Sequence, residues 1–94
     1  MFEIRPESTG TLRLIGRLDA SAAPDAMSEL TRVDHPLVAD CRELDYISSA
    51  GLGVIMETYK RLHARGHTLR LVNVAPRIRN VFRYAGLDQL IEIL

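Results

Sequence analysis

The chain has 94 residues, with 12 basic and 12 acidic side chains and a formal net charge of zero. This length favours one domain, spanning 1–94, with little surplus to enclose a large substrate, and the neutral balance points away from nucleic acid and toward a protein partner or a weak dimer. The single cysteine, Cys41, excludes an internal disulfide or a multi-thiolate metal site, and the lack of a signal segment or of an apolar run of ~20 residues predicts a cytoplasmic protein without membrane insertion.

The first third of the chain is predicted to form two strands and a helix. Residues 2–5 alternate like a strand, 6–10 form a turn, and 11–18 form a second strand with one buried face. Ser21 is the candidate N-cap of the helix that follows, and Pro24 lies in its first turn. The buried face of the second strand carries Leu12, Leu14, Gly16 and Leu18, and the helix is expected to bury Met27, Leu30 and Ala23 or Ala26.

The middle third is predicted to contain a buried strand, a loop and a long helix. Residues 37–41 form a nearly continuous apolar run, which is typical of a central strand. Residues 44–49 are predicted to be a loop, and a helix then runs from about Ser49 to Gly66, the expected C′ residue. Its apolar residues recur at the spacing of one helical face: Leu52, Ile55, Met56, Tyr59 and Leu62.

The last third adds a strand at 68–74, a helix opened by Pro76 and closed by Gly86, and a short strand at 90–94. The order β-β-α-β-α-β-α-β predicts an α/β fold with a mixed sheet of four or five strands and three main helices. Apart from the antiparallel first pair, the strands are expected to be parallel, with right-handed crossovers that place consecutive helices on one face. The third helix is expected to bury Ile78, Val81, Phe82 and Ala85.

The stretch most informative about function, residues 40–54, runs from a buried strand through a polar loop into a helix start. The first N–H groups of a helix have no partner within it, so they and the helix dipole favour an anion there. Ser48 and Ser49 stand at this start, where a structural cap and a phosphate acceptor both fit the chemistry. Gly51 and Gly53 cost about 1 kcal/mol each against alanine, so they indicate tight packing on the sheet or close approach of a partner.

The whole chain resembles the STAS domain family, which includes sulfate-transporter tails and anti-sigma factor antagonists. Residues 16–19 end the second strand in the family manner, and residues 37–40 with 46–54 resemble its signature strand, loop and helix start. A third match covers the last helix: Asn73, Pro76, Val81, Phe82, Gly86 and Leu87. The resemblance implies the STAS fold and, through the middle segment, the antagonist branch.

In that branch the resemblance implies a phosphorylated residue two positions before the motif glycine, which is Ser49 here. Ser48, which stands where many members carry Asp, is the second choice. Unphosphorylated, such a domain binds an anti-sigma factor that is also a serine kinase and so frees a sigma factor; phosphorylation releases it, and a serine phosphatase resets it. The resemblance implies no cofactor, and it implies these partner-binding residues: Asp19, Ser21, Ser48, Ser49, Ala50, Gly51, Leu52 and Gly53.

Catalytic alternatives find little support in the residue pattern. Serine hydrolysis would need a base near Ser49, and none of the histidines is placed for it: His35, His63 and His67. Asp40 stands where a receiver domain has its phosphoacceptor, but the acidic pair that would hold Mg²⁺ is missing, so Asp40 and Asp19 are expected to cap loops beside Ser49. Without a phosphate-binding loop either, the chain is predicted to be no enzyme and to bind no metal.

The cationic side chains of the second and third helices are expected to form solvated faces, with docking of an acidic partner as the alternative: Lys60, Arg61, Arg65, Arg77, Arg79 and Arg83. A second interpretation of the whole chain keeps the fold and changes the role. A stand-alone STAS domain can be a constitutive subunit of a phospholipid ABC transporter complex, in which case Ser49 would be an interface residue. Neighbouring genes for a kinase and sigma factor, or for a permease and ATPase, would distinguish the two.

Overall fold

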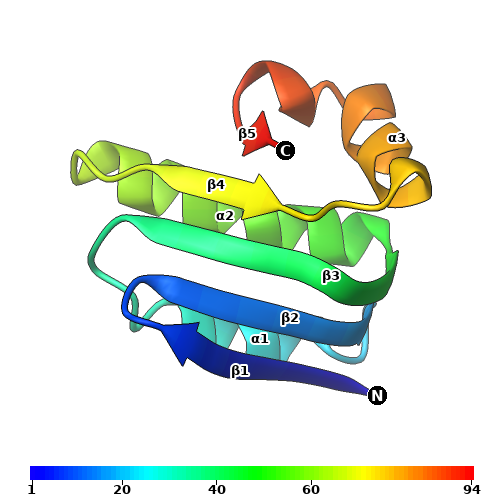
Figure 1. Ribbon diagram of the computed structural model, residues 1–94, viewed down its shortest axis with the longest axis horizontal. Helices are drawn as coiled ribbons and strands as arrows, with labels where there is room; N and C mark the ends of the chain where they lie inside the picture. The colour runs from blue at the N-terminus through cyan, green and yellow to red at the C-terminus, as the bar shows by residue number, and fades with distance from the viewer.

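The computed structural model describes residues 1–94 and contains a five-stranded sheet with three α-helices (Figure 1). The strands are hydrogen-bonded in chain order; β1 is antiparallel to β2, and each later pair is parallel. The predicted α/β class and element order are confirmed, with one added 3-10 turn, η1. The elements are β1 (Phe2–Ser8), β2 (Thr11–Leu18), α1 (Ala23–Leu30), β3 (Leu37–Ile47), α2 (Ser49–Ala64), β4 (Leu69–Val72), α3 (Pro76–Tyr84), η1 (Leu87–Gln89) and β5 (Glu92–Ile93).

Two helices cover one face of the sheet. α1 and α2 lie together behind the strands in Figure 1, as right-handed crossovers between parallel strands require. α3 lies toward the β4–β5 side, at the end of the molecule where β3 and β4 finish (Figure 1). The core fills the space between the sheet and the helices, and its largest fully buried apolar side chains are Leu14, Leu18, Leu37, Leu62, Leu71, Phe82 and Ile91.

β1 is longer than predicted because it continues through Pro6 to Ser8. The Arg17 N–H donates to the Met1 carbonyl at 2.9 Å, so alternate residues starting at Met1 face β2. Pro6 belongs to the alternate residues whose backbone nitrogen faces the free edge of the sheet. Because no hydrogen bond is made there, the N–H that proline lacks is not needed. The predicted turn is therefore confined to Thr9 and Gly10.

The prediction that Ser21 caps α1 is wrong. The helix has Ala22 as its N-cap, with no side-chain cap, and Pro24 lies in its first turn as predicted. The Ser21 hydroxyl instead donates to Asp19 Oδ1 at 2.8 Å, and the same oxygen accepts the N–H groups of Ser21 and Ala22. The Asp19 carboxylate, and not the Ser21 hydroxyl, therefore accepts the free N–H groups before α1. Of the apolar residues expected on the inner face, Ala26 and Leu30 are buried, and Ala23 and Met27 are half-buried.

β3 is the largest departure from the prediction, because the segment 44–49 was expected to be a loop. The strand continues to Ile47, and its last residue pairs with Leu18, the last residue of β2. Two register shifts in β3 allow it to follow the shorter β2 over this length. The extension carries Ser48 to the end of the sheet, directly before α2.

α2 begins at Ser49 as predicted, and Gly66 follows its end with a φ of 80°. Its buried face is rotated from the predicted one, because Gly51 lets that side of the helix approach the sheet most closely. Thr58, which was not expected on the buried face, is also buried, and its hydroxyl donates to the Val54 carbonyl at 2.8 Å, which satisfies the polar group. The buried residues are Gly51, Val54, Ile55, Thr58 and Leu62, and the predicted Leu52, Met56 and Tyr59 are half-buried.

The C-terminal strands are shorter than predicted. β4 stops at Val72 because Asn73 adopts a left-handed φ of 56°, and β5 is confined to two residues after η1. α3 begins at Pro76 as predicted, and Gly86 follows it with a φ of 77°. Its residues Ile78 and Phe82 are buried and Val81 is half-buried, whereas Ala85 lies past the helix end and is exposed. No helix of the protein is both long and apolar enough to cross a membrane.

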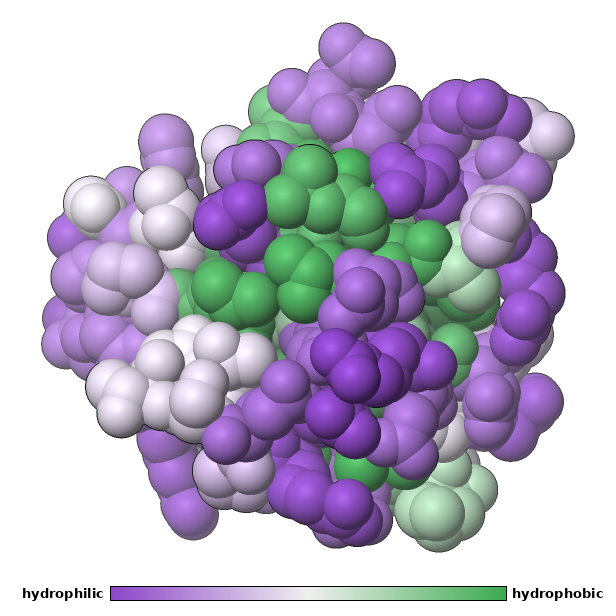
Figure 2. Space-filling model, viewed as in Figure 1, coloured by the Kyte–Doolittle hydropathy of each residue, from purple (hydrophilic) through white to green (hydrophobic).

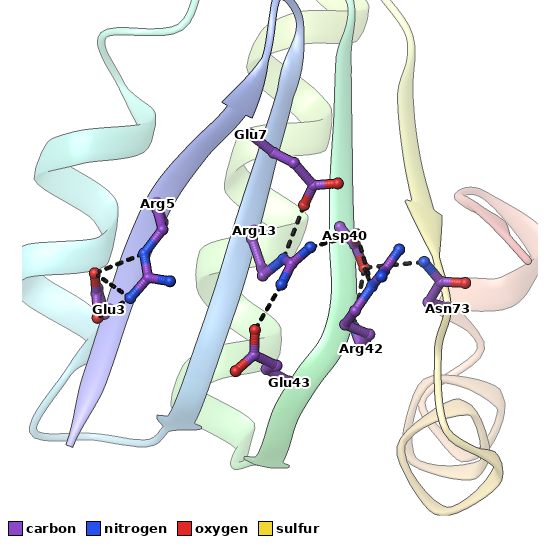
Figure 3. Close-up of polar contacts among 8 residues, drawn as sticks. All are labelled: Glu3, Arg5, Glu7, Arg13, Asp40, Arg42, Glu43 and Asn73. Carbon is purple, nitrogen blue, oxygen red and sulfur yellow. Dashed lines mark hydrogen bonds and ion pairs between the residues drawn. The ribbon is translucent and has the colours of Figure 1, made fainter.

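The face of the sheet opposite the helices carries a charge network (Figure 3). Arg13 lies between two carboxylates, with its Nε 2.8 Å from Glu7 and its Nη1 2.7 Å from Glu43. Asp40 was predicted to cap a loop, but the longer β3 places it in mid-strand, where it lies within 4 Å of Arg13 and Arg42. Figure 2 shows this face, with hydrophobic side chains gathered toward β4 and β5 and hydrophilic ones around them.

Candidate functional site

The predicted site residues meet at the carboxyl ends of the parallel strands. Leu18 ends β2 and Ile47 ends β3, and the two residues pair. The Ser48 N–H then donates to the Leu18 carbonyl at 3.0 Å, which joins the turn before α1 to the start of α2. In Figure 1 this turn, the start of α2 and α3 all lie at the right-hand end of the molecule. The carboxyl end of an open α/β sheet is where such folds usually place functional residues.

Ser48 and Ser49 differ in what their hydroxyl groups do. Ser48 is the N-cap of α2, half-buried, and its Oγ accepts the Gly51 N–H at 3.3 Å. Ser49 is the first residue of the helix, exposed, and its hydroxyl forms no hydrogen bond with the rest of the chain. Ser48 therefore has a structural role, and Ser49 presents an accessible hydroxyl to solvent.

The first turn of α2 keeps two backbone donors without an intrahelical partner. The Ser48 N–H is taken by Leu18 and the Gly51 N–H by the Ser48 side chain, which leaves the amides of Ser49 and Ala50. No acidic residue lies in this turn to neutralise the positive end of the helix dipole. An anion attached to Ser49 would therefore be favourable within the fold, by roughly 0.3–1 kcal/mol.

The two glycines near the start of α2 have different surroundings. A Cβ on Gly51 would overlap the Leu18 carbonyl oxygen and lie 2.8 Å from Cγ1 of Ile47, so this glycine is required for α2 to pack on the sheet. A Cβ on Gly53 would meet no atom within 4 Å, and the residue is exposed. Packing within the chain therefore explains Gly51 and leaves Gly53 without a structural reason.

Asp19 closes the other side of the site. The Ser21 hydroxyl and then the Ala22 N–H, both donating to its carboxylate, hold the pKa of Asp19 below its ordinary value. Its second oxygen lies 3.8 Å from Nε of Arg17, which adds a smaller electrostatic contribution. Asp19 is thus an ionised group that orders the turn into α1, and the prediction that it caps this loop is confirmed.

Arg17 and Tyr46 were missed by the sequence analysis. They pair across β2 and β3, and the Arg17 guanidinium lies 4.2 Å from the centre of the Tyr46 ring, which is 40% exposed. Reading residues 44–49 as a loop hid this pair, because only an extended β3 brings the two side chains together. A cavity of about 280 Å³ lies beside Arg17, and Asp19 and the start of β1 also line it.

The predicted partner-binding residues do not all reach the surface. Ser21, Ser49 and Gly53 are exposed, and Gly51 is buried against the sheet. The others are half-buried: Asp19, Ser48, Ala50 and Leu52. The accessible site is therefore the outer side of the first two turns of α2, with the turn after β2 beside it.

Other reactive groups lie away from this site. The histidines are placed toward the opposite end: the His63 ring stacks on Tyr59 in the last turn of α2, and the His67 Nε2 lies 3.4 Å from Asp34. Cys41 is buried in the core, and burial raises the pKa of its thiol to about 12. No group of three or more His, Cys, Asp or Glu side chains is arranged to hold a metal ion.

Comparisons with known proteins identify relatives of similar sequence and similar fold. A family model described as "Mlab, STAS domain" matches residues 2–92. The anti-sigma-B factor antagonist of Listeria monocytogenes is 32% identical over 98 aligned positions, which cover 98% of this chain and 86% of that protein. Two solved structures share the fold: an anti-sigma factor antagonist from Mycobacterium paratuberculosis (TM-score 0.81, 21% identity, 99% of this chain and 83% of that one) and unphosphorylated SpoIIAA (TM-score 0.75, 18% identity, 100% and 87%).

Proposed function

The chain belongs to the STAS domain family, and from that premise we propose that it is an anti-sigma factor antagonist controlled by phosphorylation of Ser49. The observation that carries the proposal is the exposed, unengaged Ser49 hydroxyl at the start of α2, beside a neighbour whose hydroxyl is already used as a cap. The Listeria relative, which bears the name of an antagonist, is similar over nearly the whole chain.

In its unphosphorylated form the domain binds an anti-sigma factor that is also a serine kinase, and so frees a sigma factor. The contact surface is the outer side of the first turns of α2, where Ser49 and Gly53 are exposed and Leu52 is half-exposed. A partner can approach the backbone at Gly53 because no side chain intervenes. The nucleotide, the phosphoryl transfer and the later dephosphorylation by a serine phosphatase belong to the partners, so the domain itself is no enzyme.

Phosphorylation acts on the partner contact and leaves the fold intact. A phosphoserine carries about −1.5 to −2 charges at neutral pH, which the amides and dipole at the start of α2 accommodate in the free domain. Under a docked surface the same charges lose water, and an unpaired buried charge costs several kcal/mol. The phosphorylated domain therefore releases its partner.

A mapping experiment tests the assignment. The cognate kinase and ATP are incubated with the wild type, Ser49→Ala and Ser48→Ala, and the phosphorylated peptide is identified by mass spectrometry. We expect modification of Ser49 in the wild type and in Ser48→Ala, and none in Ser49→Ala. Ser48→Ala is the matched control, and it should lose about 0.5–2 kcal/mol of stability because it removes the α2 cap. Undiminished phosphorylation of Ser49→Ala would reject the site.

A constitutive subunit of a phospholipid ABC transporter complex is the second candidate function. It is kept because the matching family model carries the description "Mlab, STAS domain". In that role the α2 surface would bind its partner permanently, and the hydroxyl of Ser49 would contribute only a contact. Genes for a permease and an ATPase beside this one, in place of a kinase and a sigma factor, would favour the subunit.

A further inference from the structure

The exposed side of α3 carries cations that no carboxylate neutralises. Seven of the twelve Lys and Arg side chains have a carboxylate oxygen within 4 Å. Three of the remaining five lie on α3, whose sequence contains no acidic residue. They donate to uncharged acceptors: Arg77 to the Asp45 carbonyl (2.9 Å), Arg79 to the Ile93 carbonyl (3.1 Å) and Arg83 to Oδ1 of Asn80 (2.8 Å).

An aromatic side chain accompanies these cations. α3 buries Ile78 and Phe82 against the core, which turns its opposite side to solvent. Tyr84 is 83% exposed, and the Arg83 guanidinium lies 5.8 Å from the centre of its ring. Folding does not need a tyrosine in this position. Tyrosine and arginine are the residue types that most often dominate the binding energy of protein interfaces.

We propose that the exposed side of α3, formed by Arg77, Arg79, Arg83 and Tyr84, binds an acidic segment of the same partner that docks at Ser49. The proposal rests on the proposed function. Arginine presents a planar fork of donors that matches the two oxygens of a carboxylate, so acidic side chains complement this surface.

The position of α3 makes its exposed side continuous with the α2 site. The Arg77 guanidinium donates to the Asp45 carbonyl, two residues before β3 ends, and Ser48 and Ser49 follow directly. Figure 1 shows α3 and the start of α2 at the same end of the molecule. One partner seated on the first turns of α2 therefore lies within reach of α3 as well.

Other anionic ligands fit less well. Three arginines fall below the clusters of four to eight basic residues that bind acidic lipid surfaces, and duplex DNA is usually held by about 6–10 phosphate contacts. The chain as a whole has no net positive charge that would strengthen binding to an acidic lipid surface or to DNA. A second copy of the chain could offer the acidic side chains of α1, Asp25 and Glu29, and this occupant is an outcome of the test below.

The first part of the test is a calorimetric titration of the cognate anti-sigma factor at two salt concentrations. Arg83→Gln and Tyr84→Ser, which leave the backbone contacts of α3 in place, are expected to bind about tenfold more weakly than the wild type. The loss of affinity in Arg83→Gln should shrink at high salt. Arg5→Gln, which removes an arginine already paired with Glu3, is the matched control and should bind like the wild type.

Wild-type affinity in both α3 variants, together with weak binding of Ser49→Asp, would overturn the α3 proposal and leave the proposed Ser49 switch standing. Wild-type affinity of Ser49→Asp would instead reject the switch.

The second part needs no partner. The amide resonances of the ¹⁵N-labelled protein are followed by NMR during additions of a ten-residue glutamate peptide, of phosphatidylcholine–phosphatidylserine vesicles and of a short DNA duplex. The peptide should shift resonances of α3 in the wild type, and at least threefold less in Arg83→Gln. An equal or stronger response to vesicles or duplex, or concentration-dependent shifts of α3 in the protein alone, would overturn the acidic-segment proposal in favour of those occupants.

Discussion

At the scale of single residues, Gly51 and Gly53 differ in what surrounds them, although both lie near the start of α2. In Gly51→Ala the new methyl group would overlap the Leu18 carbonyl, so α2 must move away from the sheet, and we expect a loss of roughly 1–3 kcal/mol, the usual cost of overpacking. In Gly53→Ala the methyl group points into open space, and we expect a gain of up to about 1 kcal/mol from helix propensity. Urea unfolding followed by circular dichroism measures both changes.

The Gly53→Ala variant also separates folding from binding. If the lack of a side chain at Gly53 lets the partner contact the helix backbone, Gly53→Ala should be more stable than the wild type and yet bind the anti-sigma factor more weakly. The new methyl group would hold the partner away from the backbone. A Gly53→Ala variant that is more stable and binds with wild-type affinity would show that the partner does not approach the helix at this point.

Asp40 gives a pH-dependent prediction. Burial alone would raise the pKa of Asp40, but hydrogen bonds from Asn73 and from the amide and guanidinium of Arg42 outweigh it and hold the pKa below its ordinary value of 3.8. A depressed pKa means that the carboxylate adds stability above pH 3.8, and that this contribution is lost as the pH falls through the folded-state value.

We therefore expect Asp40→Asn to be less stable than the wild type at pH 7, with the difference between the two proteins shrinking below about pH 4. Urea midpoints measured from pH 7 down to pH 2.5 test this expectation. A difference that stays constant over the whole range would mean that the ionised form of Asp40 contributes nothing to the folded state.

At the scale of elements, Arg61 joins the two helices on the covered face. It was expected on a solvated face, but it is half-buried, and its guanidinium donates to the carbonyls of Leu30 (2.5 Å) and Val33 (2.7 Å) at the end of α1. Val33 lies beyond the helix, and the Leu30 carbonyl also accepts the Val33 N–H at 3.1 Å. Arg61 therefore satisfies the Val33 carbonyl and adds a second donor at Leu30, which ties the end of α1 to α2.

Arg61→Met keeps most of the side-chain bulk and removes the donors, and it should cost about 1–3 kcal/mol because the Val33 carbonyl loses its partner and the Leu30 carbonyl loses one of its two donors. Arg65→Met, which breaks only an exposed pair with Asp34, is the matched control and should cost less than about 1 kcal/mol. Chemical denaturation of both variants gives the comparison. Equal losses would show that Arg61 does not hold the end of α1.

Local chemistry accounts for what the sequence analysis predicted well. Prolines in the first turns of α1 and α3, and glycines just past α2 and α3, mark helix ends through their own backbone preferences, so these boundaries could be read from a few neighbouring residues. The length of β3, the role of Asp40 and the position of Arg61 depend instead on partners that lie about 30 residues away in the chain. Ser49 was placed correctly at a helix start, whereas the surface that α3 adds beside it required the tertiary structure.

At the scale of the whole molecule, the fold brings three segments to one end of the sheet. The Cys41 thiol and the histidines lie elsewhere. The turn after β2, the start of α2 and α3 together present the unengaged Ser49 hydroxyl with cations on one side and an ionised Asp19 on the other. The core and the charge network of the open face hold this end in place without taking part in it. Such an arrangement suits a domain whose binding is switched by a single added charge.

The most direct measurement of that switch is a titration of the anti-sigma factor with the wild type, Ser49→Ala and Ser49→Asp, with circular dichroism as the control for folding. Ser49→Ala should bind like the wild type, because it adds no charge. Ser49→Asp should bind at least tenfold more weakly while remaining folded, since each 1.4 kcal/mol of desolvation cost is a factor of about ten in affinity. Equal affinity of all three folded proteins would contradict the account and would reduce Ser49 to the first residue of a helix.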